Sequence, residues 1–291
     1  MAANLHVLVL GASGMLGGTV RRTLAGRAGW CVNGTQREDR HAPDYFDILA
    51  MPGEHWAAVL ERHGYNYIIN CIGVLKAAVD EQDARSLSHA IRVNALFPHE
   101  LAALAPHSRI LHMSTDGVFS GSLRRPYVET DRTDCHDAYG KSKALGECPA
   151  PNVVNIRCSL IGRDRLGGKG LLEWVLRSPE GAELTGFDDQ VWNGVTTLQF
   201  AELCRRIIES GAFDRLRSES GLHHFCPNPA ITKYELLSQI REAAGRHITV
   251  RRGQSGSAGA RILGSVYSSL RDTYPESGSW DSVIRAAIAG E

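Results

Sequence analysis

Short apolar runs alternate with longer amphipathic stretches along the first half of the chain. The clearest run, Leu5 to Leu10, is rich in Leu and Val and stops at Gly11. It is too short for a helix, so it predicts a buried strand of a parallel sheet. Further strands are expected at 30–37, 45–49, 65–73 and from 109, and helices at 15–28, at 55–63, at 83–104 with a break near Pro98, and from 137. This regular alternation predicts an α/β fold with a doubly wound parallel sheet.

The alternation weakens beyond Gly162, which indicates a second, smaller lobe. Two capping boxes, one beginning at Thr196 and one at Thr232, predict helices at 197–210 and 233–244. The Gly- and Ser-rich stretch 251–264 predicts a mobile loop. A strand is expected at 222–226, and the apolar tail at 283–289 is expected to pack on the small lobe. We therefore expect a Rossmann-type domain at 1–160, to which 195–226 returns, and a C-terminal α/β substrate lobe formed by 161–194 and 227–291.

Composition and charge exclude several classes of protein. The chain has 291 residues, 43% of them hydrophobic and 22% charged, as in ordinary soluble proteins. Its 32 basic and 32 acidic residues cancel, so no net charge attracts nucleic acid or a membrane. The seven cysteines form no CxxC pair, and no metal-ligand spacing occurs. Without a signal peptide or a membrane-length apolar run, we expect a cytoplasmic protein with reduced thiols.

A glycine-rich turn joins the first strand to the first helix. Gly11 allows the tight turn, Gly14 allows the close approach of a pyrophosphate, and Gly17 lets the helix pack near the strand. Free N–H groups at the N-terminus of that helix bind phosphate. The alternative is a plain strand-to-helix turn. The residues expected on a dinucleotide cofactor here are Gly11, Ser13, Gly14, Met15, Leu16 and Gly17.

The choice of cofactor depends on the end of the second strand, about 20 residues past the glycine turn, where the adenosine ribose lies. Arg37 stands there, and arginine suits the 2′-phosphate of NADP(H), whereas NAD sites usually place Asp or Glu there. Arg37 therefore favours NADP(H). NAD(H) stays an alternative because Glu38 and Asp39 follow, and a solvated surface role for Arg37 also stays open.

Further contacts are expected where later strands end, because ligands bind beyond the carboxyl ends of parallel strands. Asp47 is placed to accept a hydrogen bond from the adenine amino group, with Ile48 beside it, or else it caps the next helix. Lys76 is placed to meet the substrate, or it is a solvated lysine. The next strand end is expected to bring Cys71, Ile72 and Gly73 to the cofactor.

A tyrosine and a lysine four residues apart, Tyr139 and Lys143, share one face of a predicted helix. A lysine beside a phenol lowers the pKa of the phenol and makes the tyrosine a proton donor or acceptor near neutral pH. Upstream, the strand from Arg109 runs into a hydroxyl-bearing loop with Thr115 and Asp116. The spacing of the pair also occurs by chance, so the pair alone leaves a structural role open.

In combination these motifs resemble the extended short-chain dehydrogenase/reductases. The glycine turn, Ser114-Thr115-Asp116 and Tyr139-x-x-x-Lys143 follow one another in the order and spacing of that family. Within it, the chain is most similar to the dTDP-4-dehydrorhamnose reductase group and related nucleotide-sugar reductases. The closest matches are the segments Asn70 to Lys76, Ser114 to Gly121, Tyr139 to Glu147 and Arg157 to Gly162.

The resemblance implies roles for four residues. Tyr139 would be the acid, Lys143 would hold the nicotinamide ribose and tune Tyr139, Thr115 would bond the reacting oxygen, and Asn94 would support Lys143. It also implies a reaction, in which hydride passes from NADP(H) to the 4-keto carbon of a nucleotide-activated 6-deoxyhexose while Tyr139 protonates the oxygen. A nucleotide-diphosphate sugar would be the substrate, used in deoxysugar or polysaccharide biosynthesis.

One departure from the family narrows the chemistry. Related 4,6-dehydratases carry a Glu after the Thr-Asp pair as an additional acid or base, whereas this chain has Gly117, so dehydration is not expected. Epimerisation with tightly bound NAD(P) stays open. A non-catalytic, NADP-binding role also stays open, because the regulatory subunit of methionine adenosyltransferase is similar to this reductase group.

Substrate specificity is expected in the second lobe. The segment 187–194 combines the ring of Trp192 with amides that suit a sugar or a base, although a core tryptophan is an equal alternative. The basic loop 163–170 is either a flap over the nucleotide diphosphate or a solvated loop. A homodimer stays open. The expected substrate contacts are Lys76, Thr115, Asp116, Tyr139 and Trp192.

Overall fold

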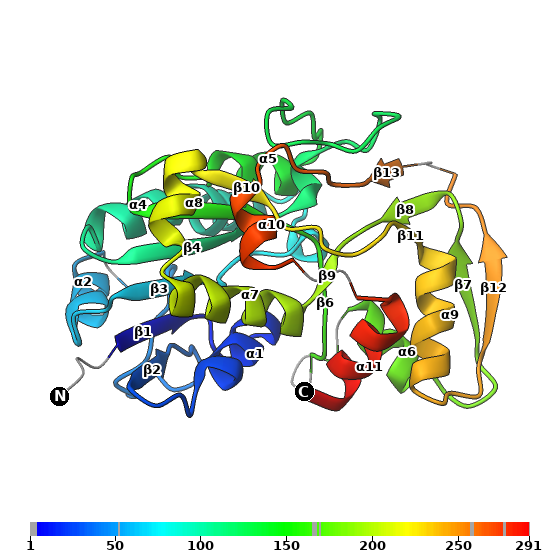
Figure 1. The fold of residues 1–291 in the computed structure, drawn as a ribbon, viewed down its shortest axis with the longest axis horizontal. Helices are drawn as coiled ribbons and strands as arrows, with labels where there is room; N and C mark the ends of the chain where they lie inside the picture. Colours follow the sequence, from blue (N-terminus) through cyan, green and yellow to red (C-terminus); the bar gives the residue numbers. More distant parts are fainter. Residues whose placement is uncertain are drawn as a thin grey trace.

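Six parallel strands form the central sheet of the computed structural model (Figure 1). The structure describes residues 5–290 except for 52, 165–167, 169, 257–258 and 276–277. The chain runs outward from β1 in both directions, so the expected α/β fold with a doubly wound sheet is confirmed. From edge to edge the strands are β10 (Leu222–His224), β5 (Val153–Arg157), β4 (Arg109–Ser114), β3 (Tyr67–Asn70), β1 (Leu5–Leu10) and β2 (Trp30–Gly34).

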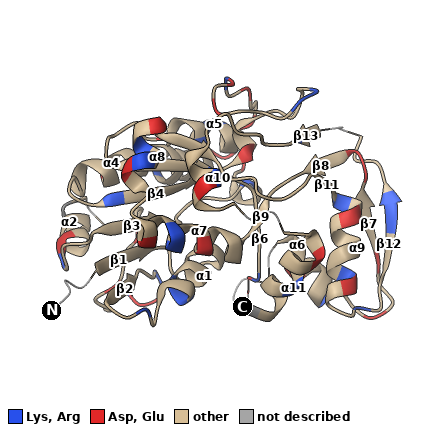
Figure 2. Ribbon diagram, in the orientation of Figure 1, with Lys and Arg blue, Asp and Glu red and all other residues tan. Residues whose placement is uncertain are grey.

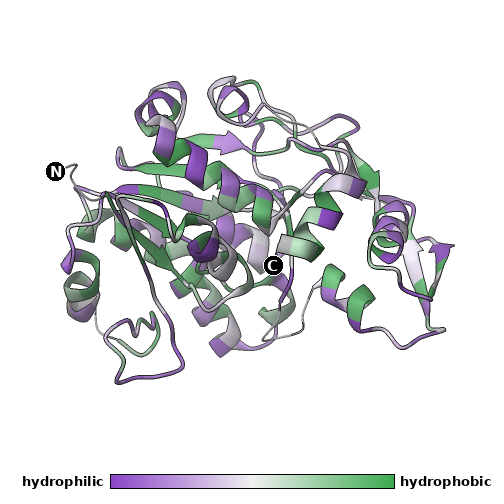
Figure 3. Ribbon diagram, turned by 60° about the horizontal axis from the view of Figure 1, so that its bottom comes forward, coloured by the Kyte–Doolittle hydropathy of each residue, from purple (hydrophilic) through white to green (hydrophobic). Residues whose placement is uncertain are grey.

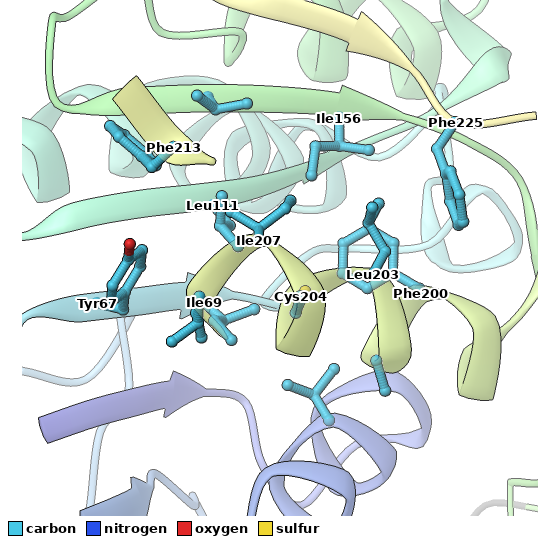
Figure 4. Packing of buried hydrophobic residues seen from close by; sticks show 14 of the residues in the cluster. Tyr67, Ile69, Leu111, Ile156, Phe200, Leu203, Cys204, Ile207, Phe213 and Phe225 are labelled. Atoms are coloured by element: carbon cyan, nitrogen blue, oxygen red, sulfur yellow. The ribbon is translucent and has the colours of Figure 1, made fainter. Parts of the chain in front are cut away.

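One face of the sheet is covered by α1 (Met15–Leu24) and α7 (Thr197–Ser210), which pack side by side. Phe200 and Leu203 of α7 point at the sheet and meet apolar side chains such as Leu111 (Figure 4). A capping box at Thr196 starts α7, as the sequence predicts. The helices α8 (Phe213–Glu219) and α10 (Ser269–Thr273) lie nearby.

The other face is covered by helices from the first half of the chain. Trp56 of α2 (Gly53–Glu61) meets Phe97 of α4 (Phe97–Leu104) edge to face, with ring centroids 5.3 Å apart. Residues alternate along each buried strand between the two faces, so both faces are apolar. This accounts for the nearly continuous apolar runs in the sequence, and Figure 3 shows the strands mostly as hydrophobic.

A smaller α/β lobe lies to the right of the sheet in Figure 1. It has a core of its own, which includes Leu172, Leu236 and Ile284. Because this core is separate, we propose that the lobe is a distinct domain with the predicted bounds, except that α10 packs with α7 and α8 of the first domain. Its elements are α6 (Leu171–Arg177), β7 (Glu183–Phe187), β8 (Gln190–Trp192), β11 (Ile231–Thr232), α9 (Lys233–Ala243), β12 (Thr249–Gly253), β13 (Gly259–Arg261) and α11 (Trp280–Gly290); β6 (Leu160–Ile161) pairs with β9 (Val195–Thr196) at the connection.

Two expectations about elements are wrong. Residues 45–49 form no strand, and Tyr45 makes only an isolated bridge with Gln36. The described residues of 251–264 do not form a loop throughout, because β12 pairs with β7 and β13 pairs with β8. The expected interruption of the 83–104 helix near Pro98 is present: a π-helical turn at Ile91–Leu96 precedes α4, and Pro98 occupies the first turn of α4.

Charged residues of both signs are interspersed over the elements of both lobes (Figure 2). This distribution agrees with the balanced composition. Among the described residues, no helix is both long enough and apolar enough to cross a membrane.

Candidate active site

The glycine turn has the geometry that a pyrophosphate needs. Gly11 has a φ of +75°, which favours glycine, and a Cβ at Gly17 would collide with the carbonyl oxygen of Gly11. The helix α1 therefore starts close against the end of β1. Its N-cap is Gly14, no side chain caps it, and its first turn holds no acidic residue. The first N–H groups of α1 are thus open to a phosphate, so the residues present fit a dinucleotide.

The ribose end of the site is formed by the glycine turn and the segment after β2. Thr35 Oγ1 accepts a hydrogen bond from the N–H of Gly11 at 3.0 Å, which fixes the two segments to each other. Arg37 is exposed, and Glu38 is hydrogen-bonded to the side chain of Ser13. An arginine and a carboxylate both stand where the adenosine ribose is expected. The preference for NADP(H) or NAD(H) depends on which of them meets the 2′ position.

Most of the other residues expected at the cofactor have side chains that are buried or make hydrogen bonds within their own segment. The side chains of Leu16 and Ile48 are buried in the core, and Met15 begins α1. Asp47 Oδ1 accepts hydrogen bonds from two N–H groups of the following turn, that of Leu49 at 2.8 Å. Asp47 therefore caps this turn and not the next helix, which begins at Gly53, and its contact with adenine stays a prediction.

The end of β3 lies between the glycine turn and the helix that carries Lys143. A Cβ at Gly11 would lie 3.1 Å from Ile72 Cγ1, so the two strand ends are in contact. A Cβ at Gly73 would lie 4.0 Å from Lys143 Nζ, so the missing side chain leaves space beside the ammonium group. Burial raises the pKa of the Cys71 thiol to about 12, so the thiol stays protonated. Ile72 and Gly73 thus lie between the glycine turn and Lys143, and the contact of Cys71, Ile72 and Gly73 with the cofactor stays a prediction.

The hydroxyl of Tyr139 lies at the loop that follows β4. It is hydrogen-bonded to the side chain of Thr115, whose Oγ1 also accepts from the N–H of Gly117 at 3.0 Å. Burial raises the pKa of Tyr139 to about 12, against the Thr115 hydrogen bond and the positive charge of Arg261. Asp116, also buried, adds to the rise. Tyr139 is therefore a protonated phenol at neutral pH, able to donate.

Lys143 lies on the same helix, α5 (Ala138–Leu145), with its side chain buried. Its Nζ donates to the carbonyl oxygen of Met113 at 2.7 Å, on the sheet. Burial lowers the pKa of Lys143 to about 8, and the carboxylate of Glu147 opposes that fall. In the protein alone Lys143 Nζ is directed at Met113, and Arg261 is the cation that lowers the pKa of Tyr139, so the action of Lys143 on Tyr139 stays a prediction.

Asn94 lies in a π-helical turn, η2 (Ile91–Leu96), between α3 (Ala84–Ala90) and α4. Its side chain accepts from the N–H of Val74 at 2.8 Å and donates to the Val74 carbonyl at 3.0 Å and to Ser142 Oγ at 3.2 Å. Asn94 therefore ties the loop after β3 to α5, next to Lys143. No hydrogen bond joins Asn94 to Lys143 among the described residues, and its support of Lys143 stays a prediction. Single π turns are frequent at functional sites.

Gly117 leaves room for the Tyr139 ring. A Cβ at Gly117 would lie 3.0 Å from Tyr139 Cε1 and 3.3 Å from Thr115 Oγ1, closer than ordinary contacts. A side chain at this position would therefore require the Tyr139 ring to shift slightly.

Gly117→Ala should lower kcat by about 10-fold, because a displacement of the acid well under 1 Å already disturbs the reacting geometry. Steady-state kinetics against Gly53→Ala test this, since a Cβ at Gly53 meets nothing within 4 Å. Equal kcat values for the two variants would contradict the tight fit at Gly117.

A cavity of about 620 Å³ opens beside this cluster, between the central sheet and the small lobe. Asp116 and Lys76 line it from the first domain, and Trp192 lines it from the second. Lys76 Nζ also pairs with Asp137 at 2.8 Å. The ring of Trp192 stacks on Trp280, with centroids 5.2 Å apart, so one tryptophan reaches the cavity while the other supports it. Further lining residues are Ser120, Ser159, Leu160, Ile161, Leu171, Gln190, Val191, Lys233, Leu236, Gly259 and Arg261.

Two basic residues of this cavity, Lys233 and Arg261, were not singled out from the sequence. Lys233 begins α9 directly after its capping box. The capping box was a usable signal for Lys233, because it marks the residue at which α9 begins. In the structure this residue lies at the cavity. Arg261 gave no such signal, because the Gly- and Ser-rich residues around it predicted a loop.

The loop expected at 163–170 lies partly outside the described residues. Within it, Arg163 Nε donates to Glu173 Oε1 at 2.7 Å.

A buried network of charged residues lies behind α5. Glu147 accepts from Arg157 Nε and Nη2 at 2.6 and 2.7 Å and from Ser114 Oγ at 2.7 Å. The side chains of Arg157 and Glu147 are 4% and 11% exposed. Arg157 Nη1 also contacts His224 Nε2 at 3.3 Å. The polar atoms of the buried pair are thus well matched, and Glu147 places a fixed negative charge one turn beyond Lys143.

Within the described ranges, no group of three or more His, Cys, Asp or Glu side chains could hold a metal ion. The candidate site contains a phenol, a lysine and a helix N-terminus that is open to a phosphate.

Comparisons with known proteins agree with this geometry. A family model described as the RmlD substrate binding domain matches residues 5–267. The dTDP-4-keto-6-deoxy-D-glucose reductase of Streptomyces niveus is 31% identical over 238 residues, which cover 79% of this chain and 75% of that protein. Methionine adenosyltransferase 2 subunit beta of Danio rerio is 27% identical over 266 residues, 88% of this chain and 80% of that protein.

A solved structure shows the same fold. It is the dTDP-4-dehydrorhamnose reductase of Bacillus anthracis in complex with NADP, with a TM-score of 0.79 at 18% identity, covering 98% of this chain and 99% of that chain. The resemblance carried by the glycine turn, Tyr139 and Lys143 is confirmed. This chain belongs to the RmlD substrate-binding domain family.

Proposed function

We propose that this protein reduces the 4-keto group of a nucleotide-activated 6-deoxyhexose, with hydride from NADPH and the proton from Tyr139. The oxidoreductase class follows from the family and from the relatives named as reductases. The observation that carries the finer proposal is the protonated phenol of Tyr139, hydrogen-bonded to Thr115 beside a cavity large enough for a sugar nucleotide.

The residues around Tyr139 have separate tasks in this reaction. NADPH, when bound, supplies the hydride. Thr115 holds the keto oxygen next to the phenol, and Tyr139 gives its proton to that oxygen as negative charge develops there. Lys143 holds a ribose hydroxyl in the space left by Gly73. Asn94 keeps α5 in place against the loop after β3. Because the protein aligns two reactants, positioning supplies much of the rate.

The substrate lies across the two lobes in this proposal. Lys76 and Lys233 line the cavity from opposite lobes and provide positive charge for the diphosphate. Trp192 offers a flat ring to the sugar or the base, held by its stacking on Trp280. The chain then works in deoxysugar or polysaccharide biosynthesis. Its cysteines are free thiols, so we place the protein in the cytoplasm. We also propose that it forms a homodimer.

The test is the loss of reduced-nicotinamide absorbance when purified protein meets NADPH and a panel of nucleotide 4-keto-6-deoxy sugars. Consumption with one of them identifies the nucleotide and the sugar. Cofactor that co-purifies with the protein without net consumption would indicate an epimerase. Binding of NADPH without turnover would favour a regulatory role like that of the Danio rerio relative.

Arg37→Asp should weaken binding of NADPH by about 10–100-fold, the loss expected for charged hydrogen bonds to the 2′-phosphate, and change NADH binding far less. Titration of each cofactor by calorimetry measures this without any sugar. Glu38→Gln is the matched variant, because it removes the carboxylate beside Ser13 and should affect NADH more. Equal losses for both cofactors in Arg37→Asp would remove Arg37 from the 2′-phosphate site.

A further inference from the structure

Residues 259–264, which we call the strap, connect the two lobes beside the cavity. The strap pairs with β8 of the small lobe through β13. It also bonds the first domain, because the Ala260 N–H donates to the Gly121 carbonyl at 3.2 Å and the Gly264 N–H donates to the Tyr127 carbonyl at 2.7 Å. The strap is therefore held by backbone atoms on both sides.

Side chains fix the strap as well. The amide of Asn193 donates to the Leu263 carbonyl and accepts from the Leu263 N–H, both at 2.8 Å. Leu263 is buried with Phe119 and Tyr127. None of these contacts uses the side chain of Arg261, so they remain when that side chain is substituted, although its own bond to Phe119 is lost.

Arg261 is carried by this strap into the cavity. Its Nε donates to the Phe119 carbonyl at 2.9 Å, which fixes the guanidinium group. Asp116, Ser159 and Trp192 line the same cavity. Within the part of the chain that the structure describes, the two terminal nitrogens of Arg261 make no hydrogen bond. A planar group with unused donors thus stands in the cavity wall next to the acid–base residues.

The charges around Tyr139 come from three segments. Asp116 follows β4, Asp137 is the N-cap of α5, and Arg261 comes from the strap, while Lys143 is directed at Met113. Asp137 is neutralised by Lys76 at 2.8 Å. Asp116 is buried and its hydrogen bonds come from the neutral side chains of Thr115 and Ser159; burial raises the pKa of its carboxyl, and Arg261 is the cation that opposes the rise.

We propose that Arg261 is a further active-site residue: its guanidinium offsets the negative charge of Asp116 beside Tyr139 and donates its terminal N–H groups to hydroxyl oxygens of the bound sugar. The small lobe thereby completes the acid–base site of the first domain. This proposal rests on the proposed reductase function for its sugar contact, and its electrostatic half stands on the protein alone.

Removing the charge of Arg261 should raise the pKa of both Asp116 and Tyr139. Asp116 then keeps its proton to a higher pH, and Tyr139 holds its proton more tightly while Asp116 is ionised. A phenol that holds its proton more tightly is a weaker acid for the keto oxygen. Activity therefore falls, and the limb of the pH profile set by Asp116 moves to higher pH.

The variants are Arg261→Gln and Arg261→Lys, with Arg252→Gln as the matched control. Arg252 lies on β12, is exposed, and stacks over Tyr234 away from Asp116. Arg261→Gln should lower kcat/KM by about 10–100-fold, as for a lost charged hydrogen bond. Arg261→Lys should recover part of the loss because it restores the charge, and Arg252→Gln should match the wild type. In an Asp116→Asn background, Arg261→Gln should cost less, because the charge that it offsets is gone and only the sugar contact is lost.

A second measurement needs no substrate. Carbon-13 NMR of labelled aspartate, with Asp116→Asn to assign the signal, follows the titration of Asp116 directly. Its midpoint should rise by about one pH unit or more in Arg261→Gln and stay unchanged in Arg252→Gln. No rise would overturn the electrostatic role, and a rise without loss of kcat/KM would overturn the role in turnover. A rise in a protein without any reductase activity would remove the proposed function and the sugar contact, while the coupling of Arg261 to Asp116 stands.

Discussion

Tyr139→Phe should lower kcat of the reductase reaction by about 10²–10⁴-fold, the usual contribution of a positioned general acid. The variant loses only the hydroxyl, and its ring still fills the space over Gly117. The fold and cofactor binding should therefore persist. Burial raises the pKa of Tyr139 to about 12, so in the wild type the proton is present across the physiological range.

Tyr67→Phe is the matched control for this experiment. Tyr67 begins β3 and packs against Phe213, at the opposite end of the strand from the cofactor site. Kinetics of both variants, together with a binding titration of NADPH, separate loss of the acid from loss of the site. Wild-type turnover in Tyr139→Phe would mean that another group donates the proton.

Glu147→Gln should lower the free energy of unfolding by about 3–5 kcal/mol, because it leaves the buried Arg157 guanidinium without its charged partner. It should also change the pH profile. Burial lowers the pKa of Lys143 to about 8, and the Glu147 carboxylate is the main charge that opposes the fall. Without that charge Lys143 loses its proton at a lower pH, so the limb of activity that falls with rising pH moves down.

Denaturant unfolding measures the first effect, and the pH dependence of kcat measures the second. Glu173→Gln is the control, because Glu173 is a 1% exposed carboxylate held by Arg163 and Arg177 in the small lobe. It should destabilise the protein while leaving the pH profile unchanged. If both variants move the alkaline limb equally, Glu147 has no particular action on Lys143.

The parts of the site that the sequence predicted depend on local chemistry. The contact of Gly17 with the Gly11 carbonyl and the spacing of Tyr139 and Lys143 on one helix are short-range features, so they are visible as motifs. The capping boxes of α7 and α9 are equally local and were also predicted. These motifs were sufficient for the family and the sheet.

The parts that the sequence did not predict depend on long-range contacts. Arg261 lies in a stretch whose glycines and serines indicate a loop, yet Asn193 and the backbone of Tyr127 order it from far along the chain. The direction of Lys143 Nζ is another case, because only the packed sheet shows that Met113 receives it. Around Arg261, tertiary contacts override the loop preference of the local composition. For Lys143, tertiary contacts decide which group its ammonium bonds.

The most direct test of the account follows the hydride itself. The protein is incubated with NADPH that carries deuterium at both C4 positions of the nicotinamide and with the panel of nucleotide 4-keto-6-deoxy sugars, and the product is examined by proton NMR. The account predicts one NADPH consumed per sugar and deuterium at C4 of the sugar, with the rate lost in Tyr139→Phe. A product without deuterium, or cofactor bound with no sugar reduced, would contradict it.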